Sequence, residues 1–505
     1  MARFPLRRHP HLYQINAYAW LEQLSAKYGR TIRLAEVPGS EWDYIAGMGF
    51  DIVWLMGVWQ RSPISRRLDQ QKNPLPDYSQ ALPGWTLADI IGSPYSVLQY
   101  EPDPRIGTWN DIDVARETLH RRKMALYLDF VGNHTALDHP WTRQHPEYYI
   151  EGTKEDFENF PHSYFRIDSD KGVIYLALGK DPYFPAWSDV AQLNHFSPEM
   201  RVAQLAELKK IASHCDGVRC DMAMLQLNEV FDRIWRPVLG DTKIPAKEFW
   251  TEARSSVPDL VLLAEAYWGT EGKLIDLGVD FVYDKGLYDS VRDGNTADIH
   301  WRLAQGIEYQ SHLGRILENH DEPRFATVFA NDRLPAVATF MGTLPGLRFY
   351  QQGEELGIKL RTPIELRTVA EQPIDVVRKQ FFSTLFAATN DDVFHSGHWS
   401  VLPVSPDYDG TSDKLFVYEW RSDEAWRLVA VNLSDAPAQG IVRLQGVGKR
   451  DIALIDVLDG TKYLRKGGDL AQQGLFIRRD AYQAHLFDVQ VIQPSEVAST
   501  RFFEQ

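Results

Sequence analysis

The chain has 505 residues, 44% of them apolar, which is enough for a large core and more than one domain. Asp and Glu total 69 against 54 Lys and Arg, and the formal net charge of −15 argues against a polyanion such as nucleic acid as partner. No run approaches the roughly 20 apolar residues that a membrane-spanning helix needs. The first residues lead into Leu12 without an apolar signal segment. We therefore expect a cytoplasmic protein with neither nucleic acid nor membrane as partner.

The two cysteines, Cys215 and Cys220, fall in one expected strand. At about 3.3 Å per residue their Cα atoms would be roughly 16 Å apart, beyond the reach of a disulfide. We expect two structural thiols, which agrees with a reducing compartment.

Eight apolar, β-branched or aromatic runs predict strands along the first four-fifths of the chain. Helical patterning separates several of them; Ser197-Pro198-Glu199, for example, has the cap, the first-turn proline and the acidic first turn of a helix start. Eight strands alternating with helices predict an α/β fold, a closed (β/α)8 TIM barrel. The strands are expected at 13–17, 51–55, 125–131, 217–222, 260–265, 280–283, 315–318 and 347–350.

Two segments depart from this alternation. The connection after the third strand is long, rich in proline and aromatic residues, and improbable as a plain loop. From about residue 395, short alternating runs with turn signals predict an antiparallel β-sandwich. The expected domains are the first part of the barrel at 1–133, an inserted subdomain B at 134–194, the second part of the barrel at 195–394 and the C-terminal β-sandwich at 395–505.

Four short blocks end expected strands in a fixed order. They are Asp129-Phe-Val-Gly-Asn-His134, Gly217-Val-Arg219-Cys-Asp221, Glu265 within Leu-Leu-Ala-Glu-Ala-Tyr-Trp, and Glu318-Asn-His320-Asp321. Because parallel strands bring their carboxyl ends to one rim, these carboxylates, histidines and the arginine should gather there. Such an arrangement suits cleavage of a glycosidic bond.

The residue types suggest separate roles. Arg219 and Asp221 share a strand face, so the guanidinium should keep Asp221 ionised as a nucleophile. Apolar neighbours of Glu265 should favour its protonated form, as a general acid requires. Asp321 would be the third acid, which binds ring hydroxyls. The supporting residues are expected to be Asp129, which orients Arg219, and His134 and His320, which bind sugar hydroxyls.

In order and spacing, these blocks resemble the conserved regions of the α-amylase superfamily, glycoside hydrolase family 13. The resemblance extends to Gly49–Trp54, to Gln192-Leu-Asn194 and to the segment from Gly346 to Glu355, and so covers nearly the whole chain. It implies the catalytic set Asp221, Glu265 and Asp321. By position, it also implies that Tyr95 stacks on the sugar at the cleaved bond.

Several features depart from the family pattern. Where many α-amylases have Lys-His after the nucleophile, this chain has Met222–Leu225, which suggests that the leaving-group side is apolar and that short substrates are preferred. The acidic calcium-type loop is missing from Tyr18–Arg30. Asn133 matches a calcium ligand of many members, but partner ligands are not evident, so we expect no cofactor. The stretch Asp138–Glu147 resembles the maltosyl-phosphate-dependent transferase branch.

The leading hypothesis is a retaining α-glycosidase that acts on α-linked gluco-oligosaccharides or glucans. A transglycosylase or a phosphate-dependent glucan or maltosyl transferase would use the same three acids and is the first alternative. A non-catalytic barrel that binds carbohydrate is the second, and it is disfavoured because Asp221, Glu265 and Asp321 are all present. The sequence leaves the linkage and the oligomeric state open.

Overall fold

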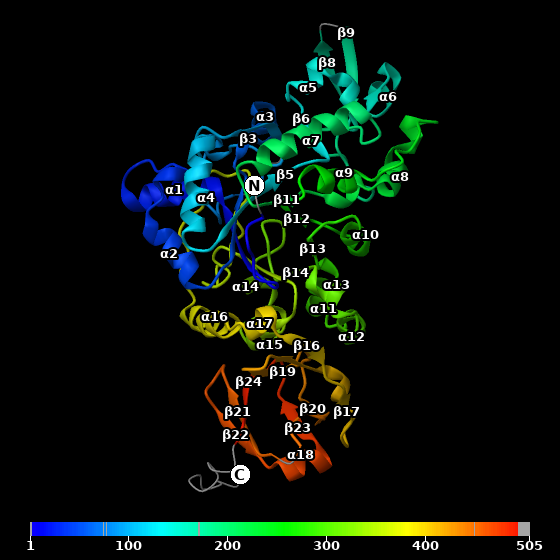
Figure 1. The fold of residues 1–505 in the computed structure, drawn as a ribbon. Helices are drawn as coiled ribbons and strands as arrows, with labels where there is room; N and C mark the ends of the chain where they lie inside the picture. The colour runs from blue at the N-terminus through cyan, green and yellow to red at the C-terminus, as the bar shows by residue number, and fades with distance from the viewer. Residues whose placement is uncertain (1–2, 74, 77, 170–171, 449, 493–505) are drawn as a thin grey trace. The chain divides into compact units, whose positions relative to one another are not determined.

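The computed structural model describes residues 3–73, 75–76, 78–169, 172–448 and 450–492 (Figure 1). Its central feature is a closed barrel of eight parallel strands, so the expected TIM barrel is confirmed. Each of the eight predicted runs overlaps one barrel strand. In barrel order the strands are β1 (His11–Asn16), β2 (Ile52–Met56), β5 (Ala125–Phe130), β11 (Gly217–Cys220), β12 (Val261–Ala264), β13 (Phe281–Tyr283), β14 (Leu313–Ile316) and β15 (Leu347–Gln351).

The chain forms two compact units. The first comprises Met1–Leu6, Leu12–Tyr283 and Leu360–Gln372, and the second comprises Arg7–His11, Asp284–Lys359 and Pro373–Gln505. Helices of the first unit are α1 (Ala17–Tyr28), α2 (Gly39–Gly47), α3 (Pro63–Gln70), α4 (Trp109–His120), α5 (Trp141–Gln144), α6 (Lys154–Asn159), α7 (Pro198–Ala212), α8 (Asn228–Leu239), α9 (Phe249–Ser256) and α10 (Glu271–Asp276). Helices of the second are α11 (Lys285–Asp293), α12 (Thr296–Leu303), α13 (Ile307–Ser311), α14 (Phe325–Val328), α15 (Leu334–Thr343), α16 (Val376–Thr389), α17 (Val393–Ser396) and α18 (Gly467–Gln473).

The predicted helix start at Ser197 is present. The Ser197 side chain accepts a hydrogen bond from the Met200 N–H, and Pro198 occupies the first turn of α7. This cap satisfies one of the amide groups that a helix start leaves unpaired. Within the part of the chain that the structure describes, no helix combines the length and the apolar character that crossing a membrane requires.

The long connection after β5 begins and ends in one strand pair. β6 (His134–Ala136) runs antiparallel to β10 (Val190–Gln192), with His134 opposite Gln192. Between them β7 (Glu151–Gly152), β9 (Gly172–Ala177) and β8 (Tyr164–Ser169) form a three-stranded sheet, beside α5 and α6 in Figure 1. A second small pair, β3 (Trp59–Arg61) and β4 (Val97–Pro102), follows β2.

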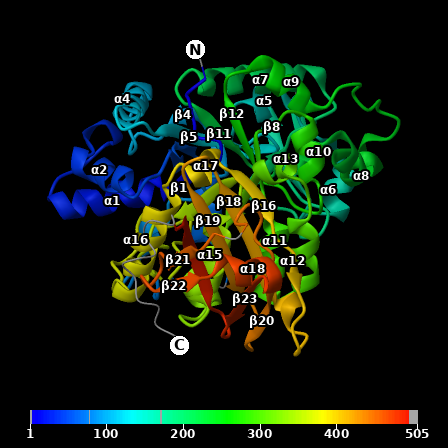
Figure 2. The same cartoon turned by 60° about the horizontal axis from the view of Figure 1, so that its bottom comes forward.

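The end of the chain forms two antiparallel sheets in the second unit. β16 (His398–Val401), β18 (Leu415–Arg421), β19 (Trp426–Asn432), β24 (Ala484–Val491), β21 (Ile452–Asp456) and β22 (Lys462–Arg465) make the larger, and β17 (Val404–Ser405), β20 (Ala438–Val442) and β23 (Leu475–Arg479) the smaller (Figure 2). Leu428 and Val417 of one sheet share a core with Val442 and Ile477 of the other, so the expected C-terminal sandwich is present. The predicted domain start at 395 falls within α17.

Candidate active site

The proposed nucleophile and the proposed acid lie at the carboxyl ends of neighbouring strands of the first unit. Asp221 directly follows β11 and Glu265 directly follows β12. The two strands are parallel, with Cys220 opposite Ala264. Pairing continues past the strand ends, because the Glu265 N–H donates to the Cys220 carbonyl at 3.0 Å. The backbone therefore fixes the two carboxylates relative to each other.

One guanidinium contacts both carboxylates. Nη1 of Arg219 donates to Oδ1 of Asp221 at 2.5 Å, and Nη2 lies 2.8 Å from Oε2 of Glu265. All three side chains are almost completely buried. The expected pairing of Arg219 with Asp221 is confirmed. The contact with Glu265 shows in addition that the two acids lie on either side of a single planar cation.

Aromatic rings surround this guanidinium. Its central carbon lies 5.5 Å from the centroid of Trp54, 5.1 Å from that of Tyr95 and 5.8 Å from that of Tyr283. Burial acts to lower the pKa of Arg219, but attraction to Glu265 and other neighbours outweighs it and raises the pKa well above the ordinary value. The arginine is thus a fixed positive charge. The structure places Tyr95, the expected stacking residue, beside it.

The expected apolar setting of Glu265 is wrong. Besides Arg219, the N–H of Met222 donates to Oε2 at 2.7 Å and the hydroxyl of Tyr267 donates to Oε1 at 2.7 Å. The apolar residues Leu262 to Ala264 that suggested the setting belong to β12 itself. A carboxyl group at a strand end takes its surroundings from neighbouring strands and loops, and here these supply donors.

Asp129 supports the surroundings of the arginine. Its Oδ1 accepts from Nε1 of Trp54 at 3.1 Å, and its Oδ2 accepts from the N–H of Gly57 at 2.7 Å. A Cβ at Gly57 would lie 2.9 Å from Pro94, and the φ of +76° also favours glycine there. Because Trp54 packs on Arg219, these contacts are consistent with the predicted orienting role.

His134 faces the nucleophile from the start of β6. Its Nε2 lies 3.9 Å from Oδ2 of Asp221, and its ring packs 5.3 Å from that of Trp187. Burial lowers the pKa of His134 to about 4, although Asp189 acts in the opposite direction. The imidazole is therefore neutral near pH 7, which suits a hydrogen-bonding partner for a sugar hydroxyl.

The surroundings of Asn133 do not fit calcium. Its side-chain oxygen accepts from Nε2 of Gln192 at 3.1 Å, and its side-chain nitrogen lies 3.4 Å from Oε1 of Gln192. Calcium takes six to eight oxygen ligands, commonly including carboxylates. Among the described residues, no group of three or more His, Cys, Asp or Glu could hold a metal ion. Asn133 instead joins β6 to β10 through Gln192.

His320 and Asp321 belong to the second unit and follow β14. Nε2 of His320 lies 3.1 Å from Oδ2 of Asp321, whose side chain is 49% exposed while His320 is buried. The side chain of Asn319 accepts from the N–H of Asp321 at 2.9 Å, which shapes the turn. Asp321 thus lies on a loop that these contacts stabilise.

Nearby in the chain, burial raises the pKa of Glu318 to about 7 although Arg324 contacts it at 2.9 Å.

The expected apolar lining after Asp221 is wrong in its main part. Ala223, Met224 and Leu225 are fully buried in a short 3-10 turn, and only Met222 is partly exposed. Three of the four residues therefore face the core. Because this run is buried, it no longer supports the expectation that short substrates are preferred.

Three further aromatic residues of the site were not predicted. Tyr283 ends a predicted strand and Trp54 is the last residue but one of another, so an aromatic residue near a strand end was an available signal for both. Tyr267 stands two residues after Glu265, in a block already quoted for its carboxylate.

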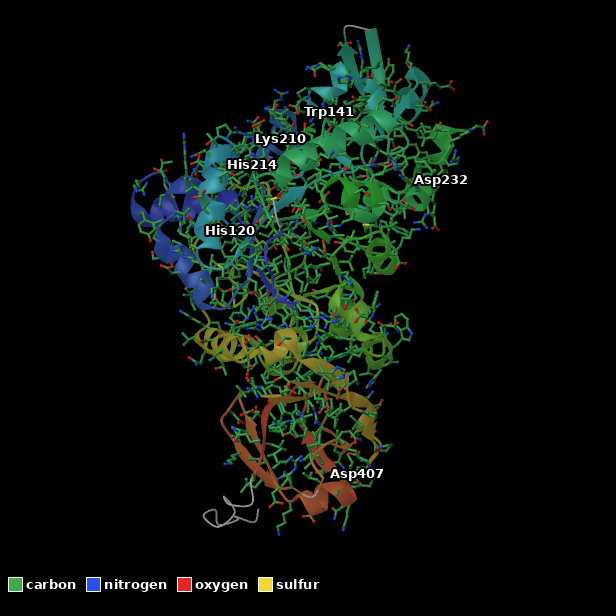
Figure 3. All side chains as sticks on the ribbon, viewed as in Figure 1. His120, Trp141, Lys210, His214, Asp232 and Asp407 are labelled. Carbon is green, nitrogen blue, oxygen red and sulfur yellow. The ribbon has the colours of Figure 1, made fainter. Side chains whose placement is uncertain are left out.

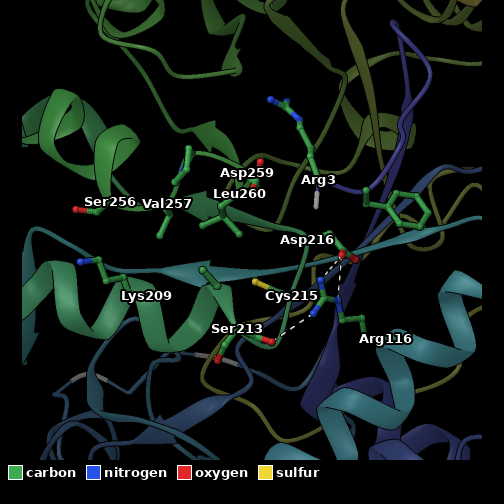
Figure 4. A pocket seen from close by; sticks show the side chains of 13 residues that line it. Arg3, Arg116, Lys209, Ser213, Cys215, Asp216, Ser256, Val257, Asp259 and Leu260 are labelled. Atoms are coloured by element: carbon green, nitrogen blue, oxygen red, sulfur yellow. Dashed lines mark hydrogen bonds and ion pairs between the residues drawn. The ribbon is translucent and has the colours of Figure 1, made fainter. Parts of the chain in front are cut away.

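A cavity of about 290 Å³ lies at the opposite ends of the same strands (Figure 4). Cys215 and Asp216, which precede β11, and Leu260, which precedes β12, line it together with residues that include Arg3 and Arg116. Catalytic residues of TIM barrels come from the carboxyl ends of the strands. The candidate active site is therefore the region around Asp221 and Glu265 and not this cavity.

Comparison with known proteins agrees with this fold. The family model for the alpha amylase catalytic domain matches residues 39–183. The chain is 26% identical to Alpha-amylase 3 of Dictyoglomus thermophilum over 295 residues, which are 53% of this chain and 54% of that protein. It is 31% identical to the alpha-1,4-glucan:maltose-1-phosphate maltosyltransferase of Arcanobacterium haemolyticum over 162 residues, 29% of this chain and 21% of that protein. The chain thus spans about half or less of these relatives.

A solved structure extends the fold comparison to almost the whole chain. The maltogenic alpha-amylase AmyB of Thermotoga neapolitana superposes with a TM-score of 0.67 at 18% identity, covering 96% of this chain and 99% of that one. The closed barrel and the C-terminal sandwich define the class of a (β/α)8 barrel protein with a C-terminal β-domain, here with carboxylates at the ends of β11 and β12. The chain is thus similar, over residues 39–183 and in its fold, to the α-amylase superfamily, glycoside hydrolase family 13.

Proposed function

We propose that this protein is a retaining α-glycosidase that hydrolyses α-glucosidic bonds in gluco-oligosaccharides or glucans. The observation that carries the proposal is the contact of one guanidinium with both Asp221 and Glu265. Retaining enzymes hold their two carboxyl groups about 5–5.5 Å apart, whereas inverting enzymes leave room for a water molecule between carboxyl and sugar. Two carboxylates that share the two ends of one guanidinium fit the shorter spacing.

In the proposed mechanism Asp221 attacks the anomeric carbon and forms a covalent glycosyl-enzyme. The bond from that carbon to the leaving oxygen breaks, and the oxygen takes a proton from Glu265. Water then attacks the same carbon, gives its proton to Glu265 and releases Asp221. Arg219 keeps Asp221 charged before attack, and the neutral His134 is placed to bind a hydroxyl of the sugar. By family resemblance, Asp321 is proposed as the third acid.

The principal alternative is transfer, in which a sugar hydroxyl or phosphate replaces water in the second step. The similarity to a maltose-1-phosphate maltosyltransferase over 162 residues favours keeping this candidate. We also propose a reducing, cytoplasmic location, because Cys215 and Cys220 are both buried and unpaired with each other.

The decisive experiment measures products from a panel of α-glucosides, with and without acceptor sugar or inorganic phosphate. Asp221→Ala should lose at least about 10⁴-fold in kcat while folding normally, because covalent catalysis is removed. Glu265→Gln should lose less on substrates with good leaving groups, and azide should partly rescue it. A folded Asp221→Ala variant with near-normal turnover would overturn the proposal. Products that appear only with phosphate would establish the alternative.

A further inference from the structure

The two carboxyl oxygens of Glu265 have partners of different kinds. Oε2 accepts from the N–H of Met222 at 2.7 Å and lies 2.8 Å from Nη2 of Arg219. A backbone N–H and a guanidinium can donate a hydrogen bond but cannot accept one. Oε1 accepts from the hydroxyl of Tyr267 at 2.7 Å, and a phenol hydroxyl can both donate and accept. A proton on Oε2 would face two donors, so the acidic proton of Glu265 belongs on Oε1.

The loop after β12 fixes the place of the Tyr267 hydroxyl. The carbonyl of Tyr267 accepts from the hydroxyl of Thr270 at 2.7 Å and from its N–H at 3.3 Å. Between these residues Trp268 and Gly269 both have a left-handed backbone, with φ of +62° and +74°. The rings of Trp268 and Tyr183 meet edge to face, with centroids 5.1 Å apart. A left-handed backbone strains a bulky residue, and such strain persists only where the surrounding contacts determine the conformation. The turn is therefore a defined one.

A second tyrosine–glutamate pair shows how such a hydroxyl affects a carboxyl group. Tyr28 donates to Oε1 of Glu41 at 2.7 Å, the same distance as in the site. Burial acts to raise the pKa of Glu41, but hydrogen bonds from Lys27 and Tyr28 outweigh it and lower the pKa. A hydroxyl that donates to a carboxylate thus favours the ionised form. Tyr267 should act on Glu265 in the same sense.

We propose that Tyr267 is a positioning residue for Glu265, and that it holds Oε1 as the oxygen that exchanges the proton with the substrate. The inference rests on the proposed function and adds a residue to its mechanism. In the first step the proton on Oε1 passes to the leaving oxygen as the bond from that oxygen to the anomeric carbon breaks. The Tyr267 hydroxyl then donates to the carboxylate that has formed.

The second step returns the proton to the same oxygen. Water forms a bond to the anomeric carbon as the bond from that carbon to Asp221 breaks, and its proton passes to Oε1 of Glu265. The Tyr267 hydroxyl turns away from the protonated oxygen, which Arg219 and the N–H of Met222 have no means of doing on Oε2. Tyr267 itself neither gives nor takes a proton.

The other groups around Glu265 keep their charge near neutral pH. Arg219 stays charged, because attraction to Glu265 and other neighbours outweighs burial and holds its pKa well above the ordinary value. Burial lowers the pKa of His134 to about 4, although Glu265 acts in the opposite direction, so His134 is neutral. Asp221 is paired with Arg219. Loss of the proton from Glu265 should therefore set the basic limb of the profile of kcat/KM against pH.

The test is Tyr267→Phe, which removes the hydroxyl and keeps the ring. The ionised form of Glu265 loses one donor, so the basic limb measured on maltotriose should move up by about 1 pH unit. The plateau value of kcat/KM on maltotriose should fall about tenfold, because the acid is less well placed. On an α-glucoside of dinitrophenol, whose leaving group needs no proton, kcat/KM should stay within about twofold of normal.

Tyr28→Phe is the matched control, because it removes the same kind of bond from Glu41, between α1 and α2. It should match the unchanged protein in the pH profile and on both substrates. A basic limb of Tyr267→Phe that stays in place or moves down, or equal losses on the two substrates, would overturn the role of Tyr267. If the unchanged protein cleaves neither substrate, or if Asp221→Ala cleaves the dinitrophenol glucoside equally well, the proposed function itself fails. The two failures are thus distinguishable.

Discussion

The two ends of β11 each carry an aspartate paired with an arginine, and the pairs differ in what completes them. At the amino end, Oδ1 of Asp216 accepts from Nη2 of Arg116 at 2.6 Å, while Oδ2 accepts from the N–H of Leu126 at 2.8 Å and lies 2.9 Å from Nε2 of His120. His120, which is labelled in Figure 3, is the last residue of α4. The Asp216 side chain is thus bonded to a neighbouring strand and to a covering helix.

At the carboxyl end, the acids are held by side chains and, for Glu265, also by the backbone N–H of Met222. Arg219 connects Asp221 with Glu265, a second carboxylate, and Asp221 faces a neutral histidine at 3.9 Å. The carboxyl end thus places two acids around one cation, whereas the amino end has a single carboxylate beside Arg116 and His120. The amino end shows that neither a buried ion pair nor an adjacent cavity identifies the candidate site. The feature that identifies it is the contact of one arginine with two acids.

Of the substitutions that distinguish the two ends of β11, Arg219→Lys should have the largest effect on activity. A lysine ammonium cannot contact two carboxylates with fixed planar geometry, so both acids would lose their orientation. We expect kcat/KM to fall about 10²–10³-fold, as for loss of a preorganised donor, with a small change in stability. Arg116→Lys at the other end is the control and should lower the melting temperature with kcat almost unchanged. The same loss of activity in both variants would contradict the distinction.

Asp216→Asn should affect stability and not catalysis. Removing one partner of a buried ion pair costs about 3 kcal/mol, since Arg116 and the Leu126 N–H then lack a charged acceptor. Urea unfolding would measure this cost, and kcat per folded molecule should stay within about twofold of normal. Asp113→Asn, which alters a more exposed pair with His214 at 2.7 Å, should cost about 0.5 kcal/mol or less. A large loss of kcat in folded Asp216→Asn would show that the amino end contributes to catalysis.

The sequence predicted the barrel well because its signals are local. Buried parallel strands give short continuous apolar runs, and each of the eight runs overlaps a barrel strand. Carboxylates at strand ends stood out for the same reason. The pairing of Arg219 with Asp221 followed from alternation along a strand, which depends on two residues of one element.

What the sequence did not predict depends on contacts between elements. The polar setting of Glu265 comes from Arg219, Tyr267 and the backbone of Met222, none of which belongs to β12. The burial of Met224 depends on a turn that directs the chain into the core. The meeting of Tyr183 with Trp268 joins residues 85 positions apart, which no local pattern encodes.

Low pH should destabilise the protein through histidines that are buried at the carboxyl ends of the barrel strands and in or beside the insert. Burial lowers the pKa of His134 to about 4, of His139 to about 3 and of His195 to about 3. Below pH 6.5 the unfolded chain therefore binds more protons than the folded chain. The contribution of these histidines to the free energy of unfolding is fully present above pH 6.5 and is lost as the pH falls toward 4. From pH 7 to pH 5, His134 alone should remove about 2 kcal/mol of unfolding free energy.

Urea unfolding at the two pH values would measure this loss. In His134→Gln the loss should be about 2 kcal/mol smaller, while His145→Gln, which alters an exposed histidine, should behave like the unchanged protein. A pH dependence that His134→Gln leaves unaltered would mean that this histidine is not the sensitive group.

The smallest expected effect concerns the left-handed backbone of Trp268, in the loop after β12. At a φ of +62° glycine avoids the Cβ contact that every other residue suffers, so Trp268→Gly should be more stable than Trp268→Ala by about 0.5–1 kcal/mol. Phe184 is not among the residues with positive φ in the described part of the chain, so there the order should reverse and Phe184→Ala should be the more stable. Urea unfolding of the four variants measures both differences. Equal stability of Trp268→Gly and Trp268→Ala would show that the left-handed backbone at this position costs nothing.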